Sequence, residues 1–138
     1  MKSVEPYLIF NGNCEEAFTF YQSVFGGDMK IMRFRDMPEK DKKNVPQADM
    51  DRVVHVLLPV SKAVSLMGSD SLSSMKMKTG DNVALTLNVE SRTEAEQIFG
   101  KLSGGGKVTM PLGKTFWAEL YGMVTDRFGI NWMVNYYI

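Results

Sequence analysis

The sequence predicts an α+β protein built from two tandem β-α-β-β-β modules, and an internal repeat is the main reason. Residues 13–17 (Asn-Cys-Glu-Glu-Ala) align without a gap on residues 91–95 (Ser-Arg-Thr-Glu-Ala), at a separation of 78 positions. The apolar stretches 6–10 and 84–88 align at the same separation. A repeat this long in a chain of 138 residues indicates a duplicated supersecondary unit, and a ligand is expected between the copies.

The first module, residues 1–70, begins with an apolar strand at 7–10. Asn13 is placed to N-cap a helix, with Glu16 three positions later in capping-box spacing, and Gly26-Gly27 ends that helix. Residues 36–51 are polar and include two prolines, which is typical of a loop. The predicted strands after the helix span residues 29–34, 53–59 and 63–67.

The second module, residues 82–138, repeats this order after a polar join at 71–81. Ser91 and Glu94 form a capping box at the start of its helix, and Gly104-Gly105-Gly106 ends it. The two modules together are expected to form one domain over residues 1–138. The predicted strands of this module span residues 83–89, 108–110, 116–124 and 131–137.

Composition excludes several classes of function. The 16 basic and 16 acidic side chains balance, and no basic block alternates with aromatics, so the chain lacks the electrostatic pattern of a nucleic-acid-binding protein. Its apolar runs are too short to span a membrane. The N-terminus lacks the apolar stretch of a signal peptide, and the single cysteine, Cys14, allows no internal disulfide, so a cytoplasmic location is expected. Cys14 itself is interpreted as a buried helix-start residue rather than a nucleophile.

The order of elements, together with several short motifs, resembles the vicinal oxygen chelate superfamily, which includes glyoxalase I, extradiol dioxygenases and the fosfomycin- and bleomycin-resistance proteins. The motifs most resemble its PhnB-like branch, some members of which are labelled demethylubiquinone methyltransferases. The residues that carry the resemblance are Pro6-Tyr7-Leu8, Glu15-Glu16-Ala17, Phe20-Tyr21, Phe25-Gly26-Gly27, His55, Leu66-Met67, Asp70, residues 105–108 and 110–112, Phe116-Trp117, residues 121–126, Phe128-Gly129 and Trp132-Met133.

In that superfamily, His, Gln or Glu side chains from the first and last strand of each module hold a divalent metal, which acts as a Lewis acid. The resemblance places the corresponding positions here at Pro6 and Ala84 (or Asn82, if a gap is allowed) and near Met67 and Met133. Thioethers are soft ligands that bind hard divalent ions poorly. No cofactor is therefore expected, and Met67 and Met133 are predicted to form the apolar floor of a substrate-binding cleft.

His55 and Glu119 are the candidate catalytic residues. His55 lies in an alternating strand and is either a pocket residue or a structural histidine with one buried hydrogen bond. Glu119 lies in the related strand of the second module, and alternation places Trp117 and Tyr121 on the same face as candidate substrate-binding residues. If this face points outward instead, Ala118 and Leu120 fill the core and Glu119 is merely solvated.

Three functions remain open at this point. The first is a PhnB-like homodimer that binds a small molecule in a metal-free cleft. The second is a metal-dependent vicinal oxygen chelate enzyme, of lyase, isomerase or transferase type, acting on a small oxygenated substrate. The third is a purely structural dimer. The methyltransferase label has no support in the sequence, because Gly104-Gly105-Gly106 follows a helix instead of the first strand, where a Rossmann-type fold binds S-adenosylmethionine.

Overall fold

Each module folds into its own compact unit in the structure, which is a computed structural model that describes residues 1–137. The first unit spans Met1–Lys78, and the second begins at Thr79. This boundary falls inside the predicted join at 71–81. Both units have the order β-α-β-β-β, which confirms the predicted fold class.

Unit 1 contains a mixed four-stranded sheet in the order β1-β4-β3-β2. The outer strand β1 runs parallel to β4, and the other neighbours are antiparallel. Three short helical turns, Phe34–Asp36, α2 (Glu39–Lys42) and Gln47–Asp49, replace the unstructured loop predicted between β2 and β3. The elements of the unit are β1 (Tyr7–Phe10), α1 (Cys14–Phe25), β2 (Lys30–Arg33), β3 (Val53–Pro59) and β4 (Ser65–Asp70).

Unit 2 repeats this topology, with its sheet in the order β5-β8-β7-β6 and with β5 parallel to β8. The strands β6, β7 and β8 are antiparallel neighbours. Its elements are β5 (Leu85–Asn88), α3 (Arg92–Ser103), β6 (Lys107–Gly113), β7 (Ala118–Thr125) and β8 (Asn131–Tyr137).

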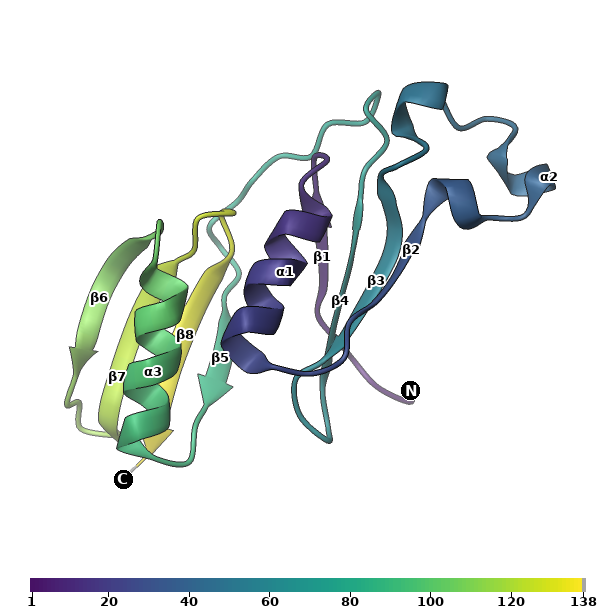
Figure 1. The fold of residues 1–138 in the computed structure, drawn as a ribbon. Coiled ribbons are helices and arrows are strands. Elements are labelled where there is room, and N and C mark those ends of the chain that lie inside the picture. The colour runs from purple at the N-terminus through teal and green to yellow at the C-terminus, as the bar shows by residue number, and fades with distance from the viewer. Residues whose placement is uncertain (138) are drawn as a thin grey trace. The chain divides into compact units, whose positions relative to one another are not determined.

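One face of each sheet is covered by the helix of its own unit (Figure 1). A Cβ atom added at Gly68 of β4 would lie 2.6 Å from Phe18 of α1, and one added at Gly122 of β7 would lie 2.8 Å from Phe99 of α3. These glycines let the helices approach the sheets closely. We call the opposite face of each sheet its helix-free face.

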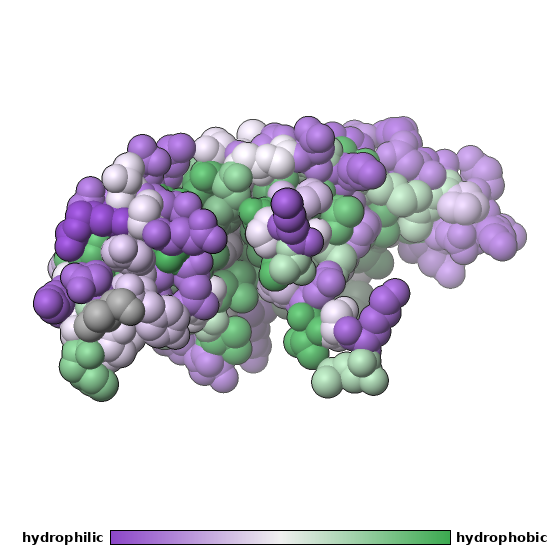
Figure 2. Space-filling view, turned by 90° about the horizontal axis from the view of Figure 1, so that it is seen from below, coloured by the Kyte–Doolittle hydropathy of each residue, from purple (hydrophilic) through white to green (hydrophobic). Residues whose placement is uncertain are grey.

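The helix-free faces carry the residues that do not enter the two cores. In unit 1 these are Tyr7, Ile9, His55, Leu57, Met67 and Ser69; in unit 2 they are Thr86, Asn88, Glu119, Tyr121, Met123, Thr125, Asn131, Met133 and Asn135. Several large apolar side chains are exposed, and Figure 2 shows apolar residues interspersed with polar ones on the side of the molecule that it views. None of the helices in the described part of the chain has the length and apolar character needed to cross a membrane.

The gap-free alignment of the modules is correct for the helices but wrong by one residue for the first strands. The buried Ala17, Tyr21 and Val24 of α1 do correspond to Ala95, Phe99 and Leu102 of α3. In the first strands, however, Tyr7 pairs with Met67, whereas Thr86 pairs with Met133. Tyr7 therefore corresponds to Thr86 and not to Leu85. Unit 2 has one residue fewer between strand and helix, and a slip of one residue exchanges the two faces of a strand.

The start of α1 also differs from the prediction. Asn13 occupies the N-cap position, but its side chain makes no capping hydrogen bond. The carboxylate of Asp70, at the end of β4, accepts hydrogen bonds from the backbone N–H groups of Gly12 and Cys14 instead, each at 2.9 Å. The capping box predicted at Asn13 is therefore wrong, whereas the Ser91 side chain does accept a hydrogen bond from the Glu94 N–H as predicted.

The join is not a free linker on its unit 1 side. Asp49, which is almost completely buried, accepts hydrogen bonds from both the backbone N–H and the hydroxyl of Ser73. The N–H of Met77 donates to the side chain of Asn11. These bonds hold residues 71–77 against the first unit.

Candidate functional site

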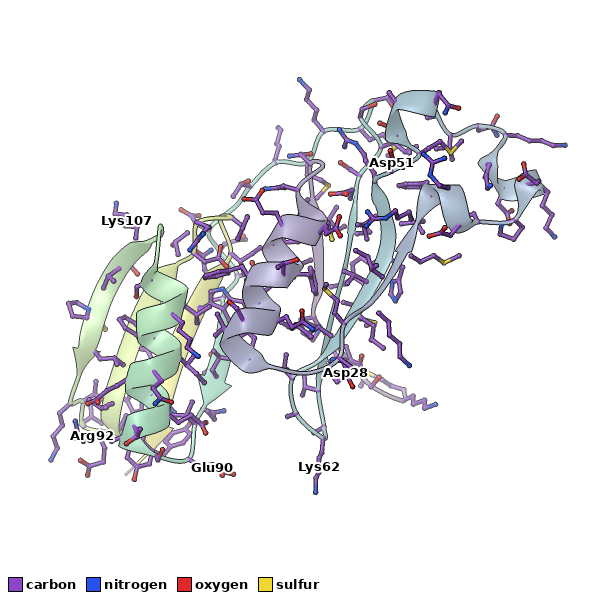
Figure 3. All side chains as sticks on the ribbon, viewed as in Figure 1. Asp28, Asp51, Lys62, Glu90, Arg92 and Lys107 are labelled. Carbon is purple, nitrogen blue, oxygen red and sulfur yellow. The ribbon has the colours of Figure 1, made fainter. Side chains whose placement is uncertain are left out.

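An opening with a volume of about 480 Å³ lies within unit 2. Met123, Thr125 and Met133 of the helix-free face line it, together with residues 81–84, which precede β5. Lys107 and Thr109 of β6 complete its rim, and Figure 3 labels Lys107 at this end of the unit, opposite the end that carries Glu90 and Arg92. The pocket thus combines an apolar floor with a polar rim, which is the usual composition of a small-molecule site.

Asn131 holds the segment that forms one wall of this pocket. Its Nδ2 donates to the backbone oxygen of Val83 at 3.1 Å, and its Oδ1 accepts from the hydroxyl of Thr125 at 2.8 Å. The segment at 81–84 is therefore tied to β8 by a side chain, although it contains no regular structure of its own. Ala84 and Asn82, which the sequence assigned to former metal-ligand positions, both line the pocket.

Methionines form the floor. Met123 and Met133 are directly opposite each other on β7 and β8, and the hydroxyl of Thr86 contacts the Met133 sulfur at 3.6 Å. In unit 1, Met67 occupies the position that corresponds to Met133, beside Tyr7 on β1 and Leu57 on β3. Thioethers adapt easily to the shape of an apolar ligand, and this chemistry suits binding better than activation of an oxygen.

Three aromatic rings gather near the start of β7. The ring of Trp117 lies 4.8 Å from that of Phe116 and 5.1 Å from that of Tyr121, and both pairs are close to perpendicular. The indole N–H of Trp117 donates to Oδ1 of Asn135 at 3.2 Å, and Asn135 is only 2% exposed. Sequence reasoning found Trp117 and Tyr121 but missed Phe116 and Asn135, because neither stands out by periodicity.

Glu119 lies on the helix-free face, as alternation requires. Its neighbours Ala118 and Leu120 are buried in the core beneath α3. This is the arrangement expected if the face that carries Glu119 points away from the core. Glu119 itself is half-buried, and within unit 2 its carboxylate has no hydrogen-bond or ion-pair partner among the described residues. It is available to a ligand.

His55 lies on the helix-free face of unit 1. Its Nδ1 is 3.4 Å from the hydroxyl of Tyr7, and the two rings are 5.9 Å apart. It is half-buried, so it is not a histidine enclosed in the core. The strand registers give Tyr121 as the counterpart of His55 in unit 2. Leu57 pairs with Met67 in unit 1 as Met123 pairs with Met133 in unit 2, and His55 and Tyr121 each lie two residues before the first member of these pairs. His55 and Glu119 belong to different units, and their meeting in one site stays a prediction.

The positions that hold metal elsewhere in this fold do not fit a hard divalent ion here. The strand registers make Leu85, and not the predicted Ala84, the counterpart of Pro6. Pro6, Leu85 and Ala84 all lack a side-chain donor, and Met67 and Met133 offer only thioethers. Nowhere in residues 1–137 do three or more His, Cys, Asp or Glu side chains come together in an arrangement that would hold a metal ion. The donor set therefore disagrees with the metal chemistry that the fold implies.

Cys14 is buried at the start of α1, as predicted. Burial raises the pKa of its thiol far above the usual range, and the nearby carboxylates of Asp70 and Glu15 raise it further. A thiol that stays protonated is a poor nucleophile. Cys14 is a packing residue.

A smaller polar pocket of about 160 Å³ lies in unit 1, lined by Asn11, Arg52, Ser71, Ser73 and Lys76 among others. No pattern in the sequence predicted this pocket. Arg52 donates to the backbone oxygen of Ser71 and pairs with Asp49, whose carboxylate also binds Ser73. Most of its polar groups therefore bind one another, and we assign it a structural role.

Comparison with known proteins gives consistent results. Residues 2–135 match the family model described as 3-demethylubiquinone-9 3-methyltransferase. Protein YjdN of Escherichia coli strain K12 is 31% identical over 137 residues, which cover 96% of this chain and 93% of that protein.

Two solved structures are similar over almost the whole chain. Pseudomonas aeruginosa protein PA1353 is 43% identical with a TM-score of 0.87, covering 99% of this chain and 98% of that one. The PhnB protein of Bacillus cereus is 25% identical with a TM-score of 0.78, covering 98% and 99%. A glyoxylase/bleomycin resistance protein/dioxygenase domain from Frankia, at 12% identity, a TM-score of 0.70 and coverage of 100% and 99%, shows the shared fold alone.

Proposed function

The chain belongs to the 3-demethylubiquinone-9 3-methyltransferase family, a PhnB-like branch of the glyoxalase, bleomycin-resistance and dioxygenase superfamily, and from this premise we propose that it binds a small molecule on the helix-free faces of its sheets. The observation that carries the proposal is the pocket of about 480 Å³ in unit 2. The floor of Met123 and Met133 contacts the apolar part of the ligand. The polar rim at Lys107 and Thr109 orients it.

The residues predicted from the sequence have distinct roles in this proposal. Met67 and Met133 provide apolar contacts, and Trp117 and Tyr121 provide a wall of aromatic rings. His55 and Glu119 are the polar groups that anchor the ligand or transfer a proton. Both are half-buried on helix-free faces, where a ligand can reach them.

Methyl transfer is not part of the proposal, although the family description names it. A methyl donor of the S-adenosylmethionine type usually binds at a Gly-rich turn that follows the first strand of a parallel sheet. Here Gly104 is the C-cap of α3, where its N–H donates to the backbone oxygen of Lys101, and the three glycines connect this helix to β6. The sheets are mixed and only four strands wide.

Metal-free binding is favoured over a metal-dependent enzyme because of the donor set at Pro6, Leu85, Met67 and Met133. A protein of this kind is expected to remain functional after chelation. We also propose that it is a cytoplasmic homodimer: the single, buried cysteine suits a reducing compartment, and the outer strands of the two sheets offer edges for a second copy.

The test combines elemental analysis of the purified protein with thermal-shift measurements. A fragment library and the divalent ions Mg²⁺, Mn²⁺, Ni²⁺ and Zn²⁺ are screened against the intact chain. We expect no stoichiometric metal and a thermal shift with fragments that have an apolar portion, since ligands that bind only the folded state stabilise it. A stoichiometric bound metal with a large stabilisation would overturn the metal-free site.

The pocket itself is tested with Ala84→Phe, which places a ring in the opening without entering the core. We expect this variant to lose the binding of any fragment found in the screen. Val64→Phe, at an exposed position in the hairpin between β3 and β4 of unit 1, is the matched control and should bind normally. Equal binding by both variants would place the ligand elsewhere.

A further inference from the structure

We infer that the aromatic surface around Trp117 takes a small organic cation, with an ammonium or guanidinium group seated over the rings beside Glu119. The inference rests on the proposed function, since it names the chemical class of ligand that this face of unit 2 binds. It comes from three features of the structure: the arrangement of the rings, the fixed orientation of Trp117, and the charge of the sheet.

The rings form walls that meet at steep angles. Trp117 is inclined at 80° to Phe116 and at 70° to Tyr121, with centroids about 5 Å apart in each pair. Phe116 is 92% exposed and Trp117 is 38% exposed, so these two rings are not buried in the core and a ligand can contact them. Ring faces carry partial negative charge and attract cations within about 6 Å of the centroid.

The orientation of Trp117 is held by two amides. Asn135 accepts the indole hydrogen bond through Oδ1, while its Nδ2 donates to Oδ1 of Asn88 at 3.0 Å. Asn135 is buried on the helix-free face. A partly exposed ring that is fixed by a buried and fully bonded side chain is pre-organised, and pre-organisation lowers the entropic cost of binding. Asn135 is therefore a positioning residue for Trp117.

The strands that carry the rings bear a single charge, which is negative, and the nearest cation in sequence is the exposed Lys114 of the hairpin between β6 and β7. In β5, β7 and β8, all of whose residues the structure describes, Glu119 is the only charged side chain. It lies between Trp117 and Tyr121 in sequence and on the same face as Tyr121. Within unit 2 its half-buried carboxylate has no partner among the described residues, and a buried charge is costly unless it is paired. A cation over the rings supplies that partner, whereas an anion would be repelled.

A neutral planar ligand would use the rings but would gain nothing from Glu119, and this difference decides the experiment. Choline is titrated against the intact protein by isothermal calorimetry, with 3,3-dimethyl-1-butanol as the neutral compound of the same shape. Methylguanidinium is the second cation. We expect both cations to bind, and choline to bind about tenfold more tightly than the alcohol, in keeping with the strength of cation–π contacts.

Glu119→Gln keeps the shape of the side chain and removes its charge. We expect it to weaken choline binding about tenfold and to leave binding of the alcohol unchanged. Glu96→Gln removes the same formal charge from the exposed surface of α3, on the other side of the sheet, and should have no effect on either. Trp117→Leu should abolish choline binding.

Asn135→Leu tests the positioning role with a readout that does not need a ligand. Trp132 is buried and Trp117 is partly exposed, so acrylamide quenching of tryptophan fluorescence reports mainly on Trp117. We expect Asn135→Leu to increase quenching and to weaken choline binding. Unchanged quenching would show that Asn135 does not hold the ring.

The results separate this inference from the proposed function. If fragments bind in the pocket but choline and its neutral analogue bind equally, or neither binds, the cation site is wrong and the proposed function stands. If Glu119→Gln and Glu96→Gln weaken choline binding to the same extent, the effect is one of net charge, and the assignment to Glu119 fails. If no fragment binds and choline does not bind, both ideas are overturned.

Discussion

Three backbone N–H groups in unit 1 donate to a single buried carboxylate, that of Asp70. Two of them, from Gly12 and Cys14, lie at the start of α1, and the third, from Val53, lies at the start of β3. The helix, the strand β3 and the strand β4 are thereby joined at one point. A carboxylate can accept several N–H bonds at once, which lets Asp70 satisfy groups that would otherwise be buried without partners.

Asp70→Ala is expected to lower the free energy of unfolding by about 3 kcal/mol or more, since it leaves several N–H groups without an acceptor. Asp70→Asn, which keeps one oxygen, should cost less. Urea denaturation measures both. Asp28→Ala is the control, because Asp28 is exposed, and its effect should stay within about 0.5 kcal/mol. A loss at Asp70 no larger than that at Asp28 would show that the carboxylate does not hold the unit together.

At the scale of elements, the two helices begin in different ways although their sequences align. The hydroxyl of Ser91 accepts the N–H of Glu94 at 3.0 Å, a local cap that the spacing of the residues predicts. The start of α1 is capped by Asp70, which is 56 residues away from Cys14 in the chain. The aligned Asn13 makes no such bond.

This difference gives a paired prediction. Ser91→Ala should destabilise the protein by about 1 kcal/mol through loss of the cap, whereas Asn13→Ala should change its stability by less than about 0.5 kcal/mol. Thermal or urea unfolding of the two variants under the same conditions measures the contrast. Equal losses of stability in both variants would contradict this explanation, because they would mean that the Asn13 side chain caps α1.

A second connection between elements depends on pH. Arg33 of β2 donates to Glu15 of α1 at 2.9 Å, and this hydrogen bond lowers the pKa of the Glu15 carboxyl below its ordinary value. A carboxyl with a lowered pKa in the folded state stabilises that state at neutral pH and loses the contribution as pH falls through the folded-state pKa. Since both side chains are substantially exposed, water screens the pair and the contribution is small.

Glu15→Gln should therefore lower the free energy of unfolding by roughly 0.3 kcal/mol at pH 7, and the difference from the parent should vanish below about pH 3. Glu16→Gln is the matched control, because Glu16 also lies in the first turn of α1 but forms no ion pair with a described residue. Urea unfolding at several pH values measures both. A Glu15 effect that persists unchanged at pH 3 would contradict the ion-pair explanation.

For the molecule as a whole, the outer strands of the two sheets bear on the assembly state. Edge strands expose unpaired backbone groups, and a second copy is one way to cover them. We expect a homodimer by sedimentation velocity, with a melting temperature that rises with protein concentration because association favours the folded state. A single monomeric species at all concentrations, with a constant melting temperature, would refute the dimer.

The order of elements could be predicted because each one rests on local signals. The apolar stripes of α1 and α3, the glycines that end them, and the alternation in β7 are all visible within windows of a few residues. Alternation also placed Glu119 and Tyr121 on one face. The type and order of the elements, and the side chains that share a face within each, could therefore be predicted from the sequence alone.

Other features depend on partners far apart in the chain, and only the tertiary structure decided them. Asp70 replaces Asn13 at the start of α1, and Asn135 reaches Trp117 and Asn88 across neighbouring strands. The one-residue slip of the first strands is defined by strand pairing: Tyr7 lies opposite Met67, and Thr86 lies opposite Met133. Periodicity shows which residues share a face but not which strand lies opposite. Pairing and register come from the cooperative packing of the whole sheet, and they determine which side chains meet in a site.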